Sequence, residues 1–184
     1  IKNPIYLFQL KWIYLKKGAY YNLRIARQKR RTVMPENKKF KVAGKQTLAY
    51  TRQERKEVGD TGGHMLSLIE AEGINISTGE TEYMNGAQVI NVVTSDLVNF
   101  NGPIQGYSIT IKKGDSAFGK FEGKIITSLS ADGTPVAVIE VSKLTWVKGT
   151  GQFQGIQGTA TAKGRYISKN IYNVEWEGEY WIDS

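Results

Sequence analysis

From residue 40 onward, apolar and polar residues alternate with the period of two that β-strands produce. The clearest segment is 105–112, which alternates Gln105, Tyr107, Ile109 and Ile111 with Gly106, Ser108, Thr110 and Lys112. Near the end of the chain, Glu175, Glu177 and Glu179 are expected on an exposed face, opposite a buried face that holds Tyr172, Val174 and Trp176. No segment after residue 40 combines a helical period with capping residues. The pattern therefore predicts an all-β domain.

Clusters of turn-forming residues divide this domain into about eight strands. We expect the strands at 42–58, 64–77, 83–98, 105–112, 118–129, 135–147, 153–165 and 166–182. Consecutive antiparallel strands with short connections predict a single closed, lipocalin-shaped barrel over residues 38–184. Eight strands enclose a lumen that side chains fill or that one small ligand occupies.

The segment 149–158, GTGQFQGIQG, is expected to form a corner of this barrel. Gly149 and Gly151 allow a turn with positive φ, and Phe153 follows as a bulky apolar plug. Gly155 and Gly158 indicate a bulge or a close approach of two backbones. The segment contains no titratable side chain, so it predicts a structural motif between the sixth and seventh strands.

This decapeptide resembles the GxGxFxGxxG signature of the allene oxide cyclase-like and dirigent-like barrels. The wider segment 42–182 is similar to uncharacterised bacterial proteins of the same barrel class. The resemblance implies an eight-stranded barrel. Allene oxide cyclases are isomerases that hold a fatty-acid epoxide in an apolar lumen, where a water and a carboxylate assist. Dirigent proteins steer the coupling or cyclisation of phenolic intermediates with acidic pocket residues. No pocket residue of either family could be matched outside 149–158.

Residues 1–33 differ in composition from the rest of the chain. They hold nine basic residues and no acidic one, whereas the remainder holds sixteen basic and seventeen acidic residues. Three interpretations stay open for this non-barrel extension: a basic amphipathic helix on an anionic membrane, a nucleic-acid-binding arm, or translated non-coding sequence upstream of Met34. Membrane contact is expected only through these residues, and no nucleic acid is expected to bind the barrel.

Several classes of chemistry are excluded by the composition. The chain has no cysteine and one histidine, His64, so thiolate catalysis and the usual zinc sites are ruled out and no metal is expected. The glycines at 59–63 lack the lysine and helix of a phosphate-binding loop, and no motif implies a cofactor. No secretory signal is recognised, so we expect a cytoplasmic protein. The sequon Asn75-Ile76-Ser77 is then a chance triplet.

Two carboxylates are the candidate catalytic residues. Glu140 shares its alternation phase with Val138, Leu144 and Trp146, so an inward Glu140 would be protonated, ion-paired or in contact with a ligand. Glu70 is in phase with Glu72 and His64, and a buried carboxyl there would have a raised pKa and could act as a general acid. The structural alternatives are an ion pair of Glu140 with Lys120, Lys124 or Arg165, and exposure of Glu70 and Glu72 to water.

Candidate ligand-binding residues are those polar or aromatic side chains that an open lumen would present. They are His64, Glu72, Asn91, Tyr107, Trp146, Trp176 and Tyr180. Three hypotheses follow: a barrel that binds a lipophilic or aromatic small molecule, a cofactor-free isomerase or cyclase that uses Glu140 and Glu70, or a solid barrel that forms homo-oligomers through its outer face. The volume and polarity of the interior discriminate between them.

Overall fold

A computed structural model describes residues 38–79, 81–82 and 84–183 of the chain. The extension predicted over residues 1–33 lies outside the described residues. The strands are β1 (Phe40–Glu57), β2 (His64–Ser77), β3 (Gln88–Val98), β4 (Gly102–Lys112), β5 (Asp115–Leu129), β6 (Pro135–Gly149), β7 (Ile156–Tyr166) and β8 (Ile171–Ile182). A short 3-10 helix, η1 (Gly151–Phe153), lies between β6 and β7.

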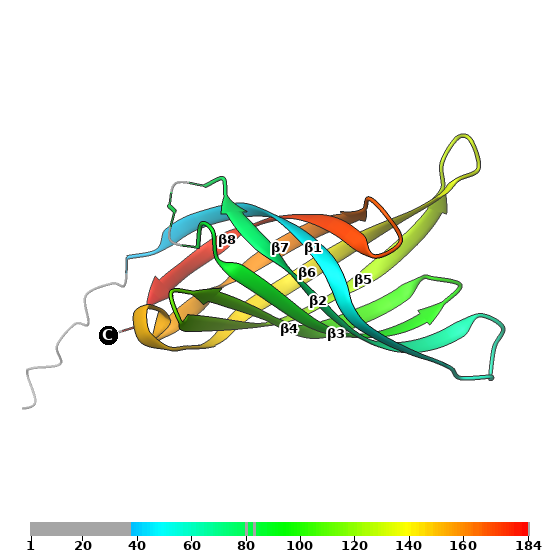
Figure 1. The fold of residues 1–184 in the computed structure, drawn as a ribbon, viewed down its shortest axis with the longest axis horizontal. Coiled ribbons are helices and arrows are strands. Elements are labelled where there is room, and N and C mark those ends of the chain that lie inside the picture. Colours follow the sequence, from blue (N-terminus) through cyan, green and yellow to red (C-terminus); the bar gives the residue numbers. More distant parts are fainter. Residues whose placement is uncertain (1–37, 80, 83, 184) are drawn as a thin grey trace, which may run out of the picture. The chain divides into compact units, whose positions relative to one another are not determined.

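The eight strands form a closed antiparallel barrel in which each strand pairs with its neighbours in sequence and β8 pairs with β1. Figure 1 shows the β1–β2 and β5–β6 hairpins extending beyond the barrel at the end opposite η1. The predicted fold class is confirmed. The third strand begins at Gln88 rather than at residue 83, because residues 84–86 form a turn.

A β-bulge in β6 reverses which residues of that strand face the interior. Val141 pairs with Ala162 and Leu144 pairs with Ala160, so β6 has one residue more than β7 between these pairs. Side chains alternate strictly between the two faces of a strand, and one extra residue shifts the alternation. Ile139 and Val141 therefore share the inner face with Leu144 although their numbers differ in parity.

The glycine-rich segment forms the corner between β6 and β7, as predicted. A Cβ atom on Gly149 would lie 1.9 Å from the carbonyl oxygen of Phe153, so only glycine fits there. Gly155 has a φ of 77°, and its carbonyl accepts a hydrogen bond from the Asp183 backbone at 2.9 Å. Gln152 attaches the corner to the β4–β5 hairpin through its side chain, which donates to the Lys112 carbonyl at 3.0 Å. These contacts connect the corner to β4, β5 and the end of β8.

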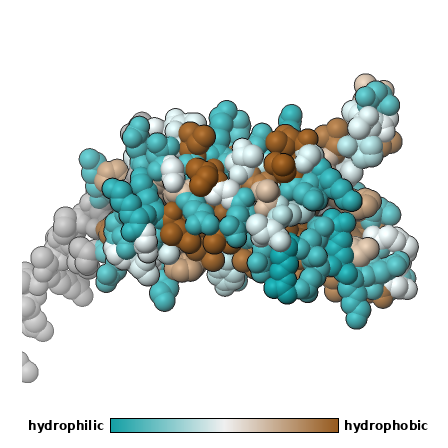
Figure 2. All heavy atoms as spheres, viewed as in Figure 1, coloured by the Kyte–Doolittle hydropathy of each residue, from teal (hydrophilic) through white to brown (hydrophobic). Residues whose placement is uncertain are grey.

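Two groups of buried apolar side chains fill much of the barrel. One surrounds Phe153 at the η1 end, and the other lies around Leu48 and Tyr172. Figure 2 shows that apolar side chains also gather in patches on the outer surface, among hydrophilic ones. The exposed large apolar residues include Ile76, Phe100 and Leu129. Among the described residues, no helix has the length and hydropathy needed to cross a membrane.

Candidate functional site

A cavity of about 90 Å³ lies inside the barrel and is lined by residues of all eight strands and by Met84. The apolar part of its wall includes Ile69, Phe121, Ile139 and Leu144. For scale, one water molecule takes roughly 30 Å³ in the liquid, and an engineered protein cavity of about 150 Å³ binds benzene. The lumen is therefore not solid, but it is smaller than the benzene-binding cavity, so a single ring enters only when lining side chains such as Met84 move aside.

Three polar atoms in this wall are buried without a hydrogen-bond partner among the described residues. They are Asn91 Oδ1, Ser95 Oγ and Trp146 Nε1. Asn91 pairs in register with Ser108, Ser108 with Gly119 and Gly119 with Trp146, so Asn91 and Trp146 lie in one row across four strands. A buried donor or acceptor without a partner costs about 1–3 kcal/mol. A bound molecule or an ordered water that satisfied these atoms would recover that energy.

Three tyrosines gather at the end of the cavity where β7 turns into β8. The hydroxyl groups of Tyr50 and Tyr166 are hydrogen-bonded to each other. The Tyr172 ring centroid lies 5.7 Å from that of Tyr50 and 5.6 Å from that of Tyr166. Burial raises the pKa of Tyr172 to about 12, and burial likewise raises the pKa of Tyr50 and Tyr166. All three phenols are therefore neutral near pH 7.

Asn75 and Trp176 form a satisfied polar pair in the same wall. Asn75 Oδ1 accepts a hydrogen bond from Trp176 Nε1 at 2.7 Å, and Asn75 Nδ2 donates to the Met84 carbonyl at 3.0 Å. Asn75 is 1% exposed. Both ends of its amide are hydrogen-bonded inside the barrel, so a glycan on Nδ2 would not fit the folded structure. The sequence offered no signal that Asn75 faces the lumen beyond its phase within β2.

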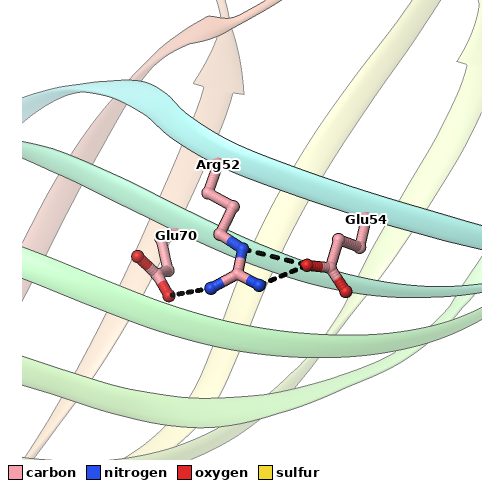
Figure 3. Close-up of polar contacts among 3 residues, drawn as sticks. All are labelled: Arg52, Glu54 and Glu70. Atoms are coloured by element: carbon pink, nitrogen blue, oxygen red, sulfur yellow. Dashed lines mark hydrogen bonds and ion pairs between the residues drawn. The ribbon is translucent and has the colours of Figure 1, made fainter.

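The two candidate catalytic carboxylates lie outside the cavity, which corrects the interior placement considered for them. Glu140 precedes the β6 bulge, faces outward and lies 3.5 Å from Lys124 Nζ. This is one of the ion pairs named above as its structural alternative. Glu70 on β2 lies 3.7 Å from Arg52 on the neighbouring strand β1, and Figure 3 shows that Arg52 also binds Glu54 on its own strand. Both carboxylates thus lie on the outer surface, where water screens their charge.

Three of the candidate ligand-binding residues line the cavity, namely Asn91, Trp146 and Trp176. Glu72 is exposed on β2, and Tyr107 is 47% exposed because the smaller Gly106, Ser108 and Thr110 take the inner face of β4. Tyr180 is buried at the η1 end, where it stacks on Phe40 with ring centroids 5.4 Å apart.

Sequence reasoning missed several lining residues as site residues. They include Gln46, Tyr50, Met84, Ser95, Tyr166 and Tyr172. Tyr172 was already expected to share a face with Val174 and Trp176, and that face proves to be the inner one. The period-two alternation in β8 could therefore have identified Tyr172 as a residue that faces the lumen.

His64 lies at the start of β2, where it links two carboxylates outside the lumen. Its Nδ1 is 2.5 Å from Asp60 and its Nε2 is 2.7 Å from Asp96 on β3. Hydrogen bonds to Asp96 and Asp60 raise the pKa of His64. An imidazolium can donate to both carboxylates at once, whereas neutral imidazole can donate to only one. His64 therefore connects the β1–β2 turn to β3, and it is not one of the residues that line the cavity.

We expect this contact to make stability depend on pH. Because the folded pKa of His64 is raised, its contribution is complete below its unfolded pKa of about 6.5 and is lost as pH rises through the folded value. The Tm of the wild-type protein should fall from pH 6 to pH 9, and His64→Gln should reduce that slope. Thermal melts followed by circular dichroism at several pH values measure both. Equal slopes in the two proteins would contradict the role given to His64.

No protein-family model matches this chain, and no curated protein matches its sequence. Solved structures similar to this chain include two pterocarpan synthase dirigent proteins. GePTS1 is 13% identical with a TM-score of 0.49, and the match covers 83% of this chain and 96% of that one. PsPTS1 is 11% identical with a TM-score of 0.43, and the match covers 80% and 97%. Both are dirigent proteins, a class that the glycine-rich motif resembles. The barrel itself is defined by the strand pairing described above.

Proposed function

We propose that this barrel binds a small lipophilic or aromatic molecule of about one ring inside its lumen. The observation that carries the proposal is the internal cavity of about 90 Å³, with a mostly apolar wall and unpaired polar atoms. Binding pockets have this composition, in which apolar lining provides affinity and a few polar groups orient the ligand. Met84 adjoins the cavity, and its flexible thioether side chain can move to accommodate a ring.

Catalysis by a buried carboxylate has less support than binding. The isomerase or cyclase hypothesis required Glu140 or Glu70 to face the lumen. Of the described residues that line the cavity, none carries a carboxylate. The neutral phenols of Tyr50, Tyr166 and Tyr172 can donate hydrogen bonds, which suits recognition of a ligand. We therefore propose a binding protein, with cyclisation or isomerisation as the alternative activity.

Toluene offers a direct test of the binding site, because it is one apolar ring. We expect toluene to shift the indole N–H resonances of Trp146 and Trp176 saturably in ¹H–¹⁵N NMR spectra. Trp181 is an internal control, since it lies on the opposite face of β8 from Trp176. If no inward indole resonance moves at saturating toluene, the proposed function is wrong.

A matched pair of variants places the binding inside the lumen. Ala162 lines the cavity, whereas its neighbour Lys163 is exposed on the outer face of β7. Ala162→Leu adds three carbons to the cavity and should reduce toluene affinity by at least about tenfold, at a cost of about 1–3 kcal/mol in stability. Lys163→Leu should leave the affinity unchanged. Unaltered binding by a folded Ala162→Leu protein would contradict an internal site.

A further inference from the structure

The wall of the cavity is polar without being charged. Of the described residues that line it, none is Asp, Glu, Lys, Arg or His. Charged side chains are frequent on the same strands, but they point outward, as Lys163 does between the inward Ala162 and Gly164. An ion placed in this lumen would lose its hydration without meeting an opposite charge, which is strongly unfavourable. This wall discriminates against anions and cations alike.

The unpaired atoms supply both kinds of neutral hydrogen-bonding partner. Trp146 Nε1 can only donate, Asn91 Oδ1 can only accept, and Ser95 Oγ can do either. Ser95 is 5% exposed and Trp146 is 4% exposed, so bulk water does not reach them. The nearby Asn75–Trp176 pair shows that this wall pairs polar groups where they serve the fold. Those left unpaired are therefore the atoms available to a guest.

Resting on the proposed function, we infer that the ligand is an uncharged molecule that carries both a hydrogen-bond acceptor and a hydrogen-bond donor on its ring or short chain. The acceptor of the ligand faces Trp146 Nε1, and its donor faces Asn91 Oδ1 or Ser95 Oγ. A lactam, a primary amide or a ring with adjacent N–H and carbonyl groups meets this description. A fatty-acid anion and an alkylammonium ion do not.

Four isosteric probes test the inference on the full chain. Benzamide, benzoate, benzamidinium and cumene have the same number of non-hydrogen atoms, and they differ in charge and in hydrogen-bonding groups. At pH 7 we expect benzamide to bind at least about tenfold more tightly than cumene, because only benzamide pairs the buried atoms. Benzoate and benzamidinium should bind at least about tenfold more weakly than cumene. NMR titration of the inward indole resonances measures all four affinities.

Single variants connect the preference to the named atoms. Trp146→Phe removes the donor and keeps an aromatic side chain, so it should abolish the preference for benzamide over cumene, whatever its effect on the two separate affinities. Trp181→Phe on the outer face is the matched control and should change neither affinity. Ser95→Ala is a smaller change that keeps the test valid should Trp146→Phe fail to fold. We expect Ser95→Ala to reduce the ratio of benzamide affinity to cumene affinity by about fivefold.

The outcomes separate this inference from the proposed function. If neither toluene nor any of the four probes binds, both proposals are overturned. If toluene binds and none of the four probes does, only the inference is wrong. If cumene binds as well as benzamide, the lumen binds apolar molecules and only the inference is wrong. Binding of benzoate or benzamidinium equal to that of benzamide would also overturn the inference alone, because it would show that charge is tolerated. Loss of the benzamide preference in Trp146→Phe or Ser95→Ala would support it.

Discussion

Alanine in place of Phe153 is expected to lower the free energy of unfolding by about 3–5 kcal/mol. Phe153 is 0% exposed and belongs to the buried group at the η1 end of the barrel, with Trp146 and Trp176. Removing its ring deletes apolar surface and leaves a void, because Gly149 holds the surrounding backbone in contact with Phe153. The corner is therefore poorly able to collapse around a smaller side chain.

Urea denaturation of Phe153→Ala measures this loss. Gln154→Ala is the matched control, since Gln154 is the next residue and is exposed. The control should stay within about 0.5 kcal/mol of wild type. If Phe153→Ala lowers the free energy of unfolding by less than about 1 kcal/mol, the corner does not depend on the buried ring of Phe153. The glycine-rich motif would then lack the structural role assigned to it.

Leucine in place of Asn75 is expected to cost at least about 2 kcal/mol of stability, although the two side chains are similar in size. The substitution leaves the Trp176 Nε1 donor and the Met84 carbonyl without the partner they now have. Each buried orphaned group costs about 1–3 kcal/mol, whereas removal of both partners of a pair costs less. Asn75 also fixes the turn at residues 84–86, so that turn should become more mobile.

A double-mutant cycle isolates the contact between Asn75 and Trp176. Trp176→Phe removes the donor, so the combined variant should lose about 1–3 kcal/mol less than the sum of the two single losses. Asn173→Leu is the control, because Asn173 is exposed on β8 and its partner Thr47 is exposed as well. Strictly additive losses for Asn75→Leu and Trp176→Phe would mean that the pair contributes little to stability.

The β6 bulge is the feature that the alternation of residues failed to predict. The alternation of residues in 171–182 was uninterrupted, and the inner face expected there, with Tyr172, Val174 and Trp176, is the one the structure shows. In β6 the same reasoning placed Glu140 with Trp146. The extra residue between Val141 and Leu144 moved Glu140 to the outer surface. A bulge without a glycine or a proline leaves no clear mark in a single sequence, because its position depends on the neighbouring strands.

The sequence likewise could not predict which buried polar atoms of the candidate site lack a hydrogen-bond partner. Asn91 was predicted to contact a ligand, but Ser95 is one of many serines and stands out only by its burial. Whether a buried polar atom finds a partner depends on which side chains cross the lumen from other strands. For Trp176 the partner is Asn75, and for Trp146 Nε1 there is none among the described residues.

The closed antiparallel barrel over residues 40–182 and its corner at 149–158 could both be predicted from the sequence. These features follow from local causes, namely the period-two alternation and the backbone freedom of glycine. The three-dimensional structure was needed to establish which face of a strand points inward beyond a bulge, how wide the lumen is, and which polar atoms remain unpaired there. Those properties arise from contacts between strands far apart in the chain, and the proposed ligand site consists of them.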